Sequence, residues 1–413
     1  MKPQNLAYIL IGIACFGLLP QMQASPQVVP APDGCYPGFT TAEGCQALQN
    51  LTTGAGNTGV GWRSLFSAGA SNFNTGVGAG TLVLNTTDSN TAVGAAAMLL
   101  NTTGTENTAL GTAALVYNDS GSYSTAVGAF ALFNSTGIGF NTAVGERTLF
   151  NNTTGDQNTA VGTSGFGGGP ALFSNTSGRF NTAVGGAALS NNTDGNDNTA
   201  VGAGALNDNI HGNENAAVGL NALVHATGNN NVALGSNAGN QAVGSDNVYI
   251  GYNMQGSAGE SNACYIKSIF GQTAAGGSAV FIDANSKLGT VTSSKRFKED
   301  IQPMDNASDT LFALKPVTFR YKKDIDPQSF PQFGLVAEDV EAVSPGLVVR
   351  DKEGKPYSVR YDAVNAMLLN EFLKEHRKMQ ALEEQVEKLT AGLQKVSAQV
   401  EASKPAPRVV NNP

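Results

Sequence analysis

The chain has 413 residues, of which 50 are glycine and 14% are charged, and its formal net charge at pH 7 is -8. This length is sufficient for two or three domains, but so much glycine with so little charge is unlike one ordinary globule. A sequence pI near 5.0 and the lack of a basic patch exclude nucleic acid as an expected partner.

Residues 1–24 have the features of a secretory signal peptide. Lys2 supplies a positive start, Leu6 to Leu19 is an uncharged apolar run of 14 residues, and Met22-Gln23-Ala24 offers a small-residue cleavage site. The run is too short to predict a membrane span. Lipidation at Cys15 is the less favoured alternative, because further apolar residues follow it. We expect a cleaved signal peptide, no transmembrane anchor in the mature chain, and a secreted, periplasmic or bacterial cell-surface location.

Three of the four cysteines remain after such cleavage. Cys35 and Cys45 flank a short Gly- and Pro-containing loop in an N-terminal segment, residues 25–50. In an exported protein this pair is expected to form a disulfide, and the alternative is two free thiols. Cys264 has no Cys or His beside it at metal-ligand spacing, so we expect a small buried side chain there. We predict neither a metal nor a cofactor.

Residues 51–252 repeat one pentapeptide, of which Asn90-Thr91-Ala92-Val93-Gly94 is an example. Successive copies are 16 or 17 residues apart, except for one step of 23 that holds an insertion at Gly165 to Pro170. A fixed period of this length indicates a solenoid. A second apolar residue stands five positions after the Val or Leu of most copies, which fits short strands and tight turns better than a helix.

We therefore expect a mainly β fold with about 12 parallel coils, one for each repeat. Each pentapeptide Val or Leu is expected to stack on its counterpart one coil away, while asparagines form ladders along the turns. Asn85, Asn101 and Asn152 formally match the N-glycosylation pattern, but they recur in phase with the repeat and are interpreted as turn residues. Two apolar positions per coil bury little surface, so the rod is expected to bury its remaining apolar face against copies of itself.

The pentapeptide resembles the head repeats of trimeric autotransporter adhesins. Those heads form a trimeric left-handed β-roll, so the resemblance implies a left-handed parallel β-roll or solenoid. Those adhesins end in a membrane β-barrel anchor, whereas this chain ends in heptads and a disordered tail, predicted over residues 403–413. The resemblance also supports an alternative function: a cell-surface adhesin that binds a host or neighbouring-cell ligand through its repeat head or the insertion.

Residues 253–292 lose the repeat and are typical of a narrow connector, since glycine, serine and alanine separate short strand-like runs. Beyond them, Pro316 to Tyr321 alternates apolar and polar residues as a half-buried strand does. Residues 347–350 and 357–361 flank a Gly-containing turn, which predicts a hairpin.

The last part of the chain predicts a long coiled-coil helix over residues 364–402, after a small α+β domain. Its apolar residues are alternately four and three positions apart, and Glu375 is the one polar break. The apolar positions are Leu368, Phe372, Met379, Leu382, Val386, Leu389, Leu393, Val396 and Val400. This pattern implies self-association without fixing the number of strands.

Between the two compositions lies the stretch Ser293-Ser294-Lys295-Arg296-Phe297-Lys298-Glu299-Asp300-Ile301. Together with the later blocks Pro316–Phe319, Gly334–Val340 and Val359–Asp362, it resembles the intramolecular chaperone domain of phage endosialidases and tail spikes, family 74 of the serine peptidases. We assign this domain to residues 293–363, with the helix as its last part.

In that family the domain trimerises a fibre and then cuts itself off. The resemblance implies that Ser293 is the nucleophile, that Lys298 is its general base, and that the bond between Thr292 and Ser293 is cut. Ser294 stands where the family favours Asp, and Phe297 stands where it has Leu.

The implied chemistry requires a particular arrangement of the two side chains. A serine hydroxyl is a poor nucleophile unless a base takes its proton, and a lysine is such a base when burial lowers its pKa. Residues five apart on one helix point to different faces, so we expect Ser293 in an extended segment that folds back beside Lys298. The alternative is a loop serine near a solvated lysine. The resulting prediction is a secreted or cell-surface homotrimeric fibre protein whose C-terminal domain drives assembly and releases itself.

Overall fold

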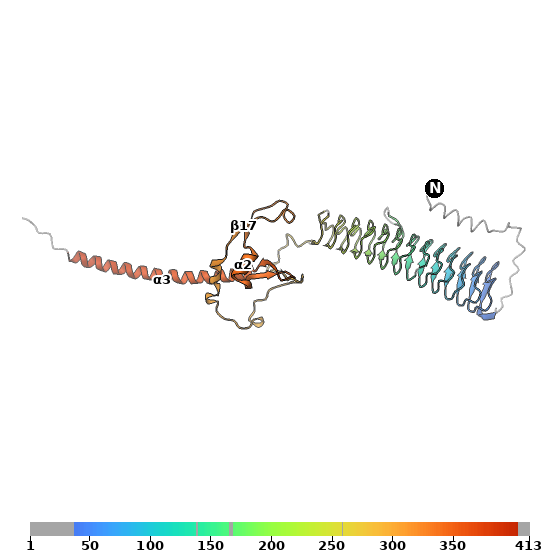
Figure 1. Cartoon of the computed structure of the whole chain (residues 1–413), viewed down its shortest axis with the longest axis horizontal. Helices are drawn as coiled ribbons and strands as arrows, with labels where there is room; N and C mark the ends of the chain where they lie inside the picture. Colours follow the sequence, from blue (N-terminus) through green and yellow to red (C-terminus); the bar gives the residue numbers. More distant parts are fainter. Residues whose placement is uncertain (1–36, 138, 165–167, 258, 404–413) are drawn as a thin grey trace, which may run out of the picture. The chain divides into compact units, whose positions relative to one another are not determined.

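The computed structural model describes residues 37–137, 139–164, 168–257 and 259–403. The predicted signal peptide, Cys35 and the tail from residue 404 lie outside these residues. The chain divides into two compact units, Met1–Thr273 and Ala274–Pro413. The first is a solenoid of stacked coils, and the second contains small sheets and a long helix (Figure 1). The predicted mainly β fold class is confirmed.

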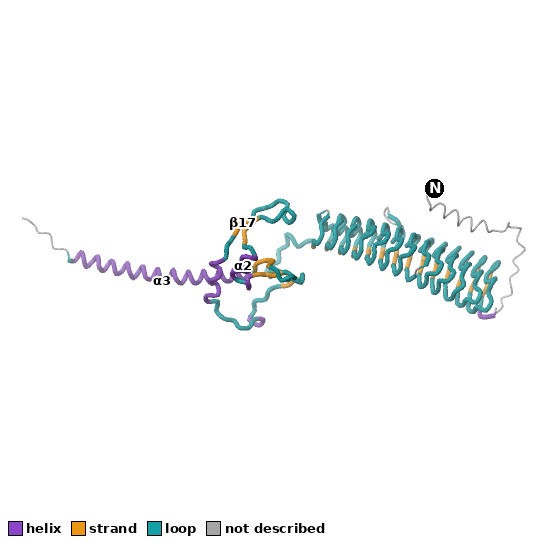
Figure 2. The backbone as a smooth tube through the Cα atoms, in the orientation of Figure 1, coloured by secondary structure: helices purple, strands orange, loops and turns teal. Residues whose placement is uncertain are grey.

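The solenoid is built on one parallel sheet of 14 strands, in which each strand pairs with the next along the chain. The strands are short and lie in one row across the coils (Figure 2). After a 3-10 turn η1 (Pro37–Phe39), they are β1 (Thr41–Glu43), β2 (Thr58–Val60), β3 (Thr75–Val77), β4 (Thr91–Val93), β5 (Thr108–Leu110), β6 (Thr125–Val127), β7 (Thr142–Val144), β8 (Thr159–Val161), β9 (Thr182–Val184), β10 (Thr199–Val201), β11 (Ala216–Val218), β12 (Val232–Leu234), β13 (Val248–Ile250) and β14 (Cys264–Ile266). The solenoid thus begins before and ends after residues 51–252.

The interior of each coil is filled by small and medium side chains. In β7, the middle residue Ala143 is fully buried, and so is Leu149 on the return segment of the same coil. Thr142 and Val144 point to the other side of the strand and are half-buried. Each pentapeptide Val does lie beside its counterpart in the next strand, as expected, but it lies on the outer face. We call the outward side of β2 to β14, formed by the first and third residues of each strand, the strand face.

The glycine that ends each pentapeptide is required by the close stacking of the coils. Gly111 has a φ of +140°, and a Cβ there would lie 2.6 Å from the carbonyl carbon of Gly128 in the next coil. Only glycine combines this backbone conformation with so close an approach.

Buried asparagines connect the coils through two hydrogen-bonded ladders. In one ladder the Asn198 backbone N–H donates to Asn181 Oδ1 over 3.1 Å, and Asn198 Nδ2 donates to the Gly212 carbonyl over 2.8 Å. In the other, Asn101 Nδ2 donates to Asn85 Oδ1 over 2.6 Å. The three Asn-Thr-Thr sites, Asn85, Asn101 and Asn152, are fully buried in this second ladder. The expected asparagine ladders are confirmed.

One coil interrupts the second ladder, because Ser135 stands where the coils on either side have asparagine. In the first ladder Ser124 replaces asparagine in the same coil, and its Oγ still accepts the Asn141 N–H over 3.4 Å. Among the described atoms, Asn118 Oδ1 and Ser135 Oγ are buried without a hydrogen-bond partner. Aromatic stacking accompanies this interruption, since the rings of Phe133 and Phe150 lie 5.0 Å apart and nearly parallel. A stacked pair of this kind contributes about 1 kcal/mol beyond its buried area.

The last coils close the solenoid with two tyrosines. Tyr249 and Tyr265 occupy the inward strand position that holds Ala in most coils, and their parallel rings lie 5.8 Å apart. Tyr265 Oη donates to Glu260 Oε2 over 2.6 Å. Cys264 is exposed, so the prediction that it is buried is wrong. It occupies the first strand position, whose side chain points away from the core.

The second unit has a small core beneath its long helix. Val340, Leu347, Val359 and Val364 form the buried cluster. Its elements are β15 (Phe281–Ile282), β16 (Leu288–Gly289), η2 (Lys295–Phe297), η3 (Asp305–Ala313), β17 (Val317–Phe319), β18 (Gln332–Gly334), α2 (Ala337–Val343), η4 (Pro345–Leu347), β19 (Val348–Arg350), β20 (Pro356–Val359) and α3 (Tyr361–Ala402). The predicted hairpin is the antiparallel pair β19–β20, and the predicted helix begins at Tyr361. Within the described residues, no helix is sufficiently long and apolar to cross a membrane.

The asparagine ladder yields a direct stability test. Asn198→Ala removes the hydrogen bonds that Asn198 Nδ2 donates to the Gly212 carbonyl and to Asn181 Oδ1. It also leaves the buried backbone N–H of Asn215, which donates to Asn198 Oδ1 over 3.0 Å, without its acceptor. We expect a loss of about 2–4 kcal/mol, measured by thermal or denaturant unfolding, because a buried unsatisfied donor adds its desolvation cost to the lost bonds. Asn191→Ala, at an exposed position one coil earlier, is the control and should change stability by less than about 1 kcal/mol. Equal effects of the two variants would contradict the ladder's role.

Candidate functional site

The structure brings Ser293 and Lys298 together. Lys298 Nζ donates a hydrogen bond to Ser293 Oγ over 3.1 Å. The turn η2 between them makes this possible: the Phe297 N–H donates to the Ser294 carbonyl, and the Lys298 N–H donates to the Lys295 carbonyl. Ser294 and Lys298 both have extended backbones on either side of this turn. The chain therefore reverses within five residues, which is the arrangement that the pairing implied by the family resemblance requires.

Both side chains are exposed in the single chain, as is Thr292. In this hydrogen bond Lys298 is the donor, whereas a general base must accept the proton of the serine hydroxyl. That transfer needs a neutral amine, and burial is the usual cause of one at neutral pH. The geometry of a nucleophile and its base is present in one chain, but the desolvated surroundings are not.

The other predicted site residues are the two cysteines of the expected disulfide. Cys45 is exposed, and because Cys35 lies outside the described residues the disulfide stays a prediction. His376, which belongs to no predicted site, lies on α3 with its ring parallel to that of Phe372. In the described part of the chain, no three His, Cys, Asp or Glu side chains gather as metal ligands do.

A polar cluster that the sequence analysis missed fastens η3 to α3. Ser308, which is fully buried, hydrogen-bonds to Glu371 and accepts a bond from Asn370 Nδ2 over 2.6 Å. Lys374 Nζ lies 2.7 Å from both Asp309 Oδ1 and Glu371 Oε1. Hydrogen bonds from Lys374, and then from Ser308, hold the pKa of Glu371 below its usual value. The bonds to Asp309 and Glu371 raise the pKa of Lys374.

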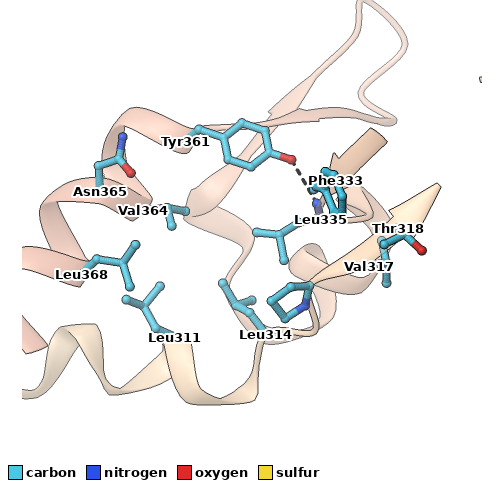
Figure 3. A pocket seen from close by; sticks show the side chains of 12 residues that line it. Leu311, Leu314, Val317, Thr318, Phe333, Leu335, Tyr361, Val364, Asn365 and Leu368 are labelled. Atoms are coloured by element: carbon cyan, nitrogen blue, oxygen red, sulfur yellow. Dashed lines mark hydrogen bonds between the residues drawn. The ribbon is translucent and has the colours of Figure 1, made fainter. Parts of the chain in front are cut away.

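An apolar pocket opens beside the same helix. Its volume is about 520 Å³, and it is lined by residues of η3, β17, β18 and the first two turns of α3 (Figure 3). Tyr361 lies across its rim, where its Oη accepts the N–H of Leu335 over 3.0 Å. The pocket combines residues from distant parts of the sequence, so no local sequence pattern predicted it.

Comparison with known proteins bears on this unit. Residues 293–349 match the family of serine peptidases 74, described as the chaperone of endosialidase. The match starts at Ser293 and includes Lys298, β17, β18 and α2. It confirms the resemblance of the C-terminal region over these residues, while the likeness of the repeats to adhesin heads stays a prediction. No curated protein matches the chain.

The ion-paired cluster predicts how stability depends on pH. Because the folded-state pKa of Glu371 is lowered, its contribution is present above its unfolded value of about 4.3 and is lost as the pH falls through the lowered folded value. The contribution of Lys374 is also stabilising but depends on pH in the opposite direction, and it is lost only as the pH rises above about 10.4. We expect Glu371→Gln to lower the Tm of the C-terminal unit at pH 7 and to have a progressively smaller effect as the pH falls below about 4.3. Glu384→Gln, in an exposed pair with Lys388, is the control; a pH-independent effect of Glu371→Gln would contradict this assignment.

Proposed function

We propose that this chain is an exported, homotrimeric fibre protein whose C-terminal unit joins three copies in register. In this proposal the unit then releases itself by one cleavage per chain, between Thr292 and Ser293. Support comes from the match of residues 293–349 to the chaperone of endosialidase and from two apolar surfaces that a single chain leaves uncovered.

The observation that carries the proposal is the exposed apolar stripe of α3. Its nine positions, from Leu368 to Val400, are each more than half exposed in the single chain. Fully burying one such side chain stabilises by about 1.5–3 kcal/mol, and these nine are already partly covered, so burying the rest of the stripe is worth roughly 10 kcal/mol per chain. Heptad stripes of this kind pair with other helices. We call these nine positions the seam.

The strand face supports the same conclusion. From β2 to β14 its described residues are Thr, Val, Leu, Ile, Ala or Cys, and none is charged. Monomeric soluble proteins rarely leave so long an apolar surface uncovered. The face also repeats at every coil, as a surface does when it meets identical coils of another copy. Two separate units of one chain therefore both present self-complementary apolar surfaces.

Self-cleavage is the second part of the proposal, and it rests on the hydrogen bond between Lys298 Nζ and Ser293 Oγ. Attack by Ser293 Oγ on the Thr292 carbonyl carbon would be an N-to-O acyl shift. The peptide bond between Thr292 and Ser293 breaks, an ester between Thr292 and Ser293 Oγ forms, and Ser293 gains a free amino group. Water then hydrolyses the ester, which leaves Thr292 as a new C-terminus and Ser293 as a new N-terminus. Assembly in the proposed trimer would supply the burial that Lys298 lacks.

A charge on the strand face tests the proposed packing of the solenoids. Val201→Lys would place three ammonium groups in an apolar contact, so we expect the assembled protein to melt several degrees lower and to dissociate more readily on dilution. Light scattering and thermal unfolding measure both effects. Thr154→Lys makes the same change of charge at an exposed corner of the coil and should leave both unchanged. The packing assignment fails if Val201→Lys and Thr154→Lys behave alike.

Cleavage is tested on a denaturing gel with wild type, Ser293→Ala and Lys298→Ala. We expect the fragment 293–413 only in wild type, because each variant removes the nucleophile or the base. Mass spectrometry of the fragment should give Ser293 as its first residue. Three uncut samples that are still trimeric in solution would retain the assembly function and remove the peptidase. A well-folded wild-type monomer would contradict the assembly function itself.

A further inference from the structure

The pocket of the C-terminal unit and the seam of α3 form one continuous surface. Seam positions are alternately four and three residues apart, and the same alternation continued toward the start of α3 gives Asn365 and then Tyr361. Both residues, together with Leu368, line the pocket (Figure 3). The pocket is therefore the beginning of the helix face whose apolar side chains are uncovered in one chain.

The walls of the pocket extend the small core of the unit. Leu311, Leu314 and Leu335 line it, and the same three side chains pack against the buried cluster of the unit. The opening of about 520 Å³ lies at the surface beside a core of only four buried residues, so apolar side chains next to that core are left uncovered. Filling the opening with apolar side chains would enlarge the core.

The polar groups around the pocket are few. Asn365 and Thr318 are exposed at its rim, while Tyr361 Oη is already engaged by Leu335. Pockets for small molecules usually contain several placed polar groups that orient the ligand. An apolar surface with an asparagine at one seam position is instead typical of coiled-coil contacts, where such an asparagine fixes register and the number of helices.

We infer that this pocket receives the α3 helix of a second copy, and that Asn365 sets the register of the copies. The inference rests on the proposed trimer. Leu369 and Phe372 are the residues of the second copy that fit the pocket, since they are 59% and 67% exposed and lie on the turn next to Leu368. When identical helices pack in parallel, residues with the same number lie side by side. Leu369 and Phe372 of one copy therefore reach the pocket of another, while the Asn365 amides meet at the axis of the proposed trimer.

The test fills the pocket in the full-length protein. Asn365→Trp occupies the opening from the helix, and Thr318→Trp occupies it from β17. We expect both variants to lose the trimer, seen by sedimentation as at least a tenfold rise in the concentration needed for assembly. Ala366→Trp, at the neighbouring exposed position that does not line the pocket, should remain trimeric. Asn365→Ala leaves the pocket open but removes the amide that sets the register, so it should still associate but no longer as trimers alone. Circular dichroism at 222 nm checks that the helix of each variant is retained.

The outcomes separate this inference from the proposed function. A monomeric wild type would remove the trimer and the inference together. A trimeric wild type whose Asn365→Trp and Thr318→Trp variants assemble as tightly as Ala366→Trp would overturn the pocket contact alone. If one tryptophan variant fails to fold, the other decides. Release of a small apolar compound on organic extraction of the wild type, lost in both tryptophan variants while they stay trimeric, would assign the pocket to a ligand instead.

Discussion

A coil of 16 or 17 residues encloses a narrow interior, and this constraint determines which side chain each strand turns inward. From β4 to β12 the inward strand residue is Ala, and it meets Leu or Met from the return segment of its coil or Ala from the neighbouring coils. The larger Val and Leu residues of the same strands therefore lie outside. Glycine at the end of each pentapeptide and buried asparagine at its start let the coils stack so closely. One steric limit thus accounts for the tight stacking and for the uncovered apolar face.

The same regularity that makes the solenoid possible makes its register ambiguous. Every coil presents nearly the same strand face, so two solenoids displaced by one coil would lose few contacts. The ladder interrupted at Ser135 marks one coil as different, but most of the others are equivalent. In the proposed trimer, the second unit would carry the register information that the repeats lack, because its core is non-repetitive and polar Asn365 and Glu375 interrupt the four-three pattern of α3. The ambiguous register of the repeats is thus the physical reason for the second unit in the proposed fibre.

The sequence predicted the parts of the structure that depend on period and spacing. The 17-residue repeat gives the coils and the four-three alternation gives α3, whereas the close approach of Lys298 to Ser293 was implied by the family resemblance. It did not predict that Val144 faces outward and Ala143 inward, because alternation identifies two faces without saying which one is the core. That choice depends on the width of the coil. The exposure of Cys264 follows from the same rule, since it shares the outward position of Thr142.

The replacement of the family's Asp by Ser294 bears on the turn more than on the reacting groups. Ser294 immediately precedes η2 and has an extended backbone, as a residue at the N-terminal cap of a helical turn does. Serine and aspartate are both favoured at such positions, although the Ser294 side chain forms no capping bond here. The turn nonetheless places Lys298 Nζ 3.1 Å from Ser293 Oγ. What the pair lacks in one chain is burial, and residue 294 does not supply it. The chemistry of this site therefore depends on what covers residues 292–298 more than on the one position where the motif differs.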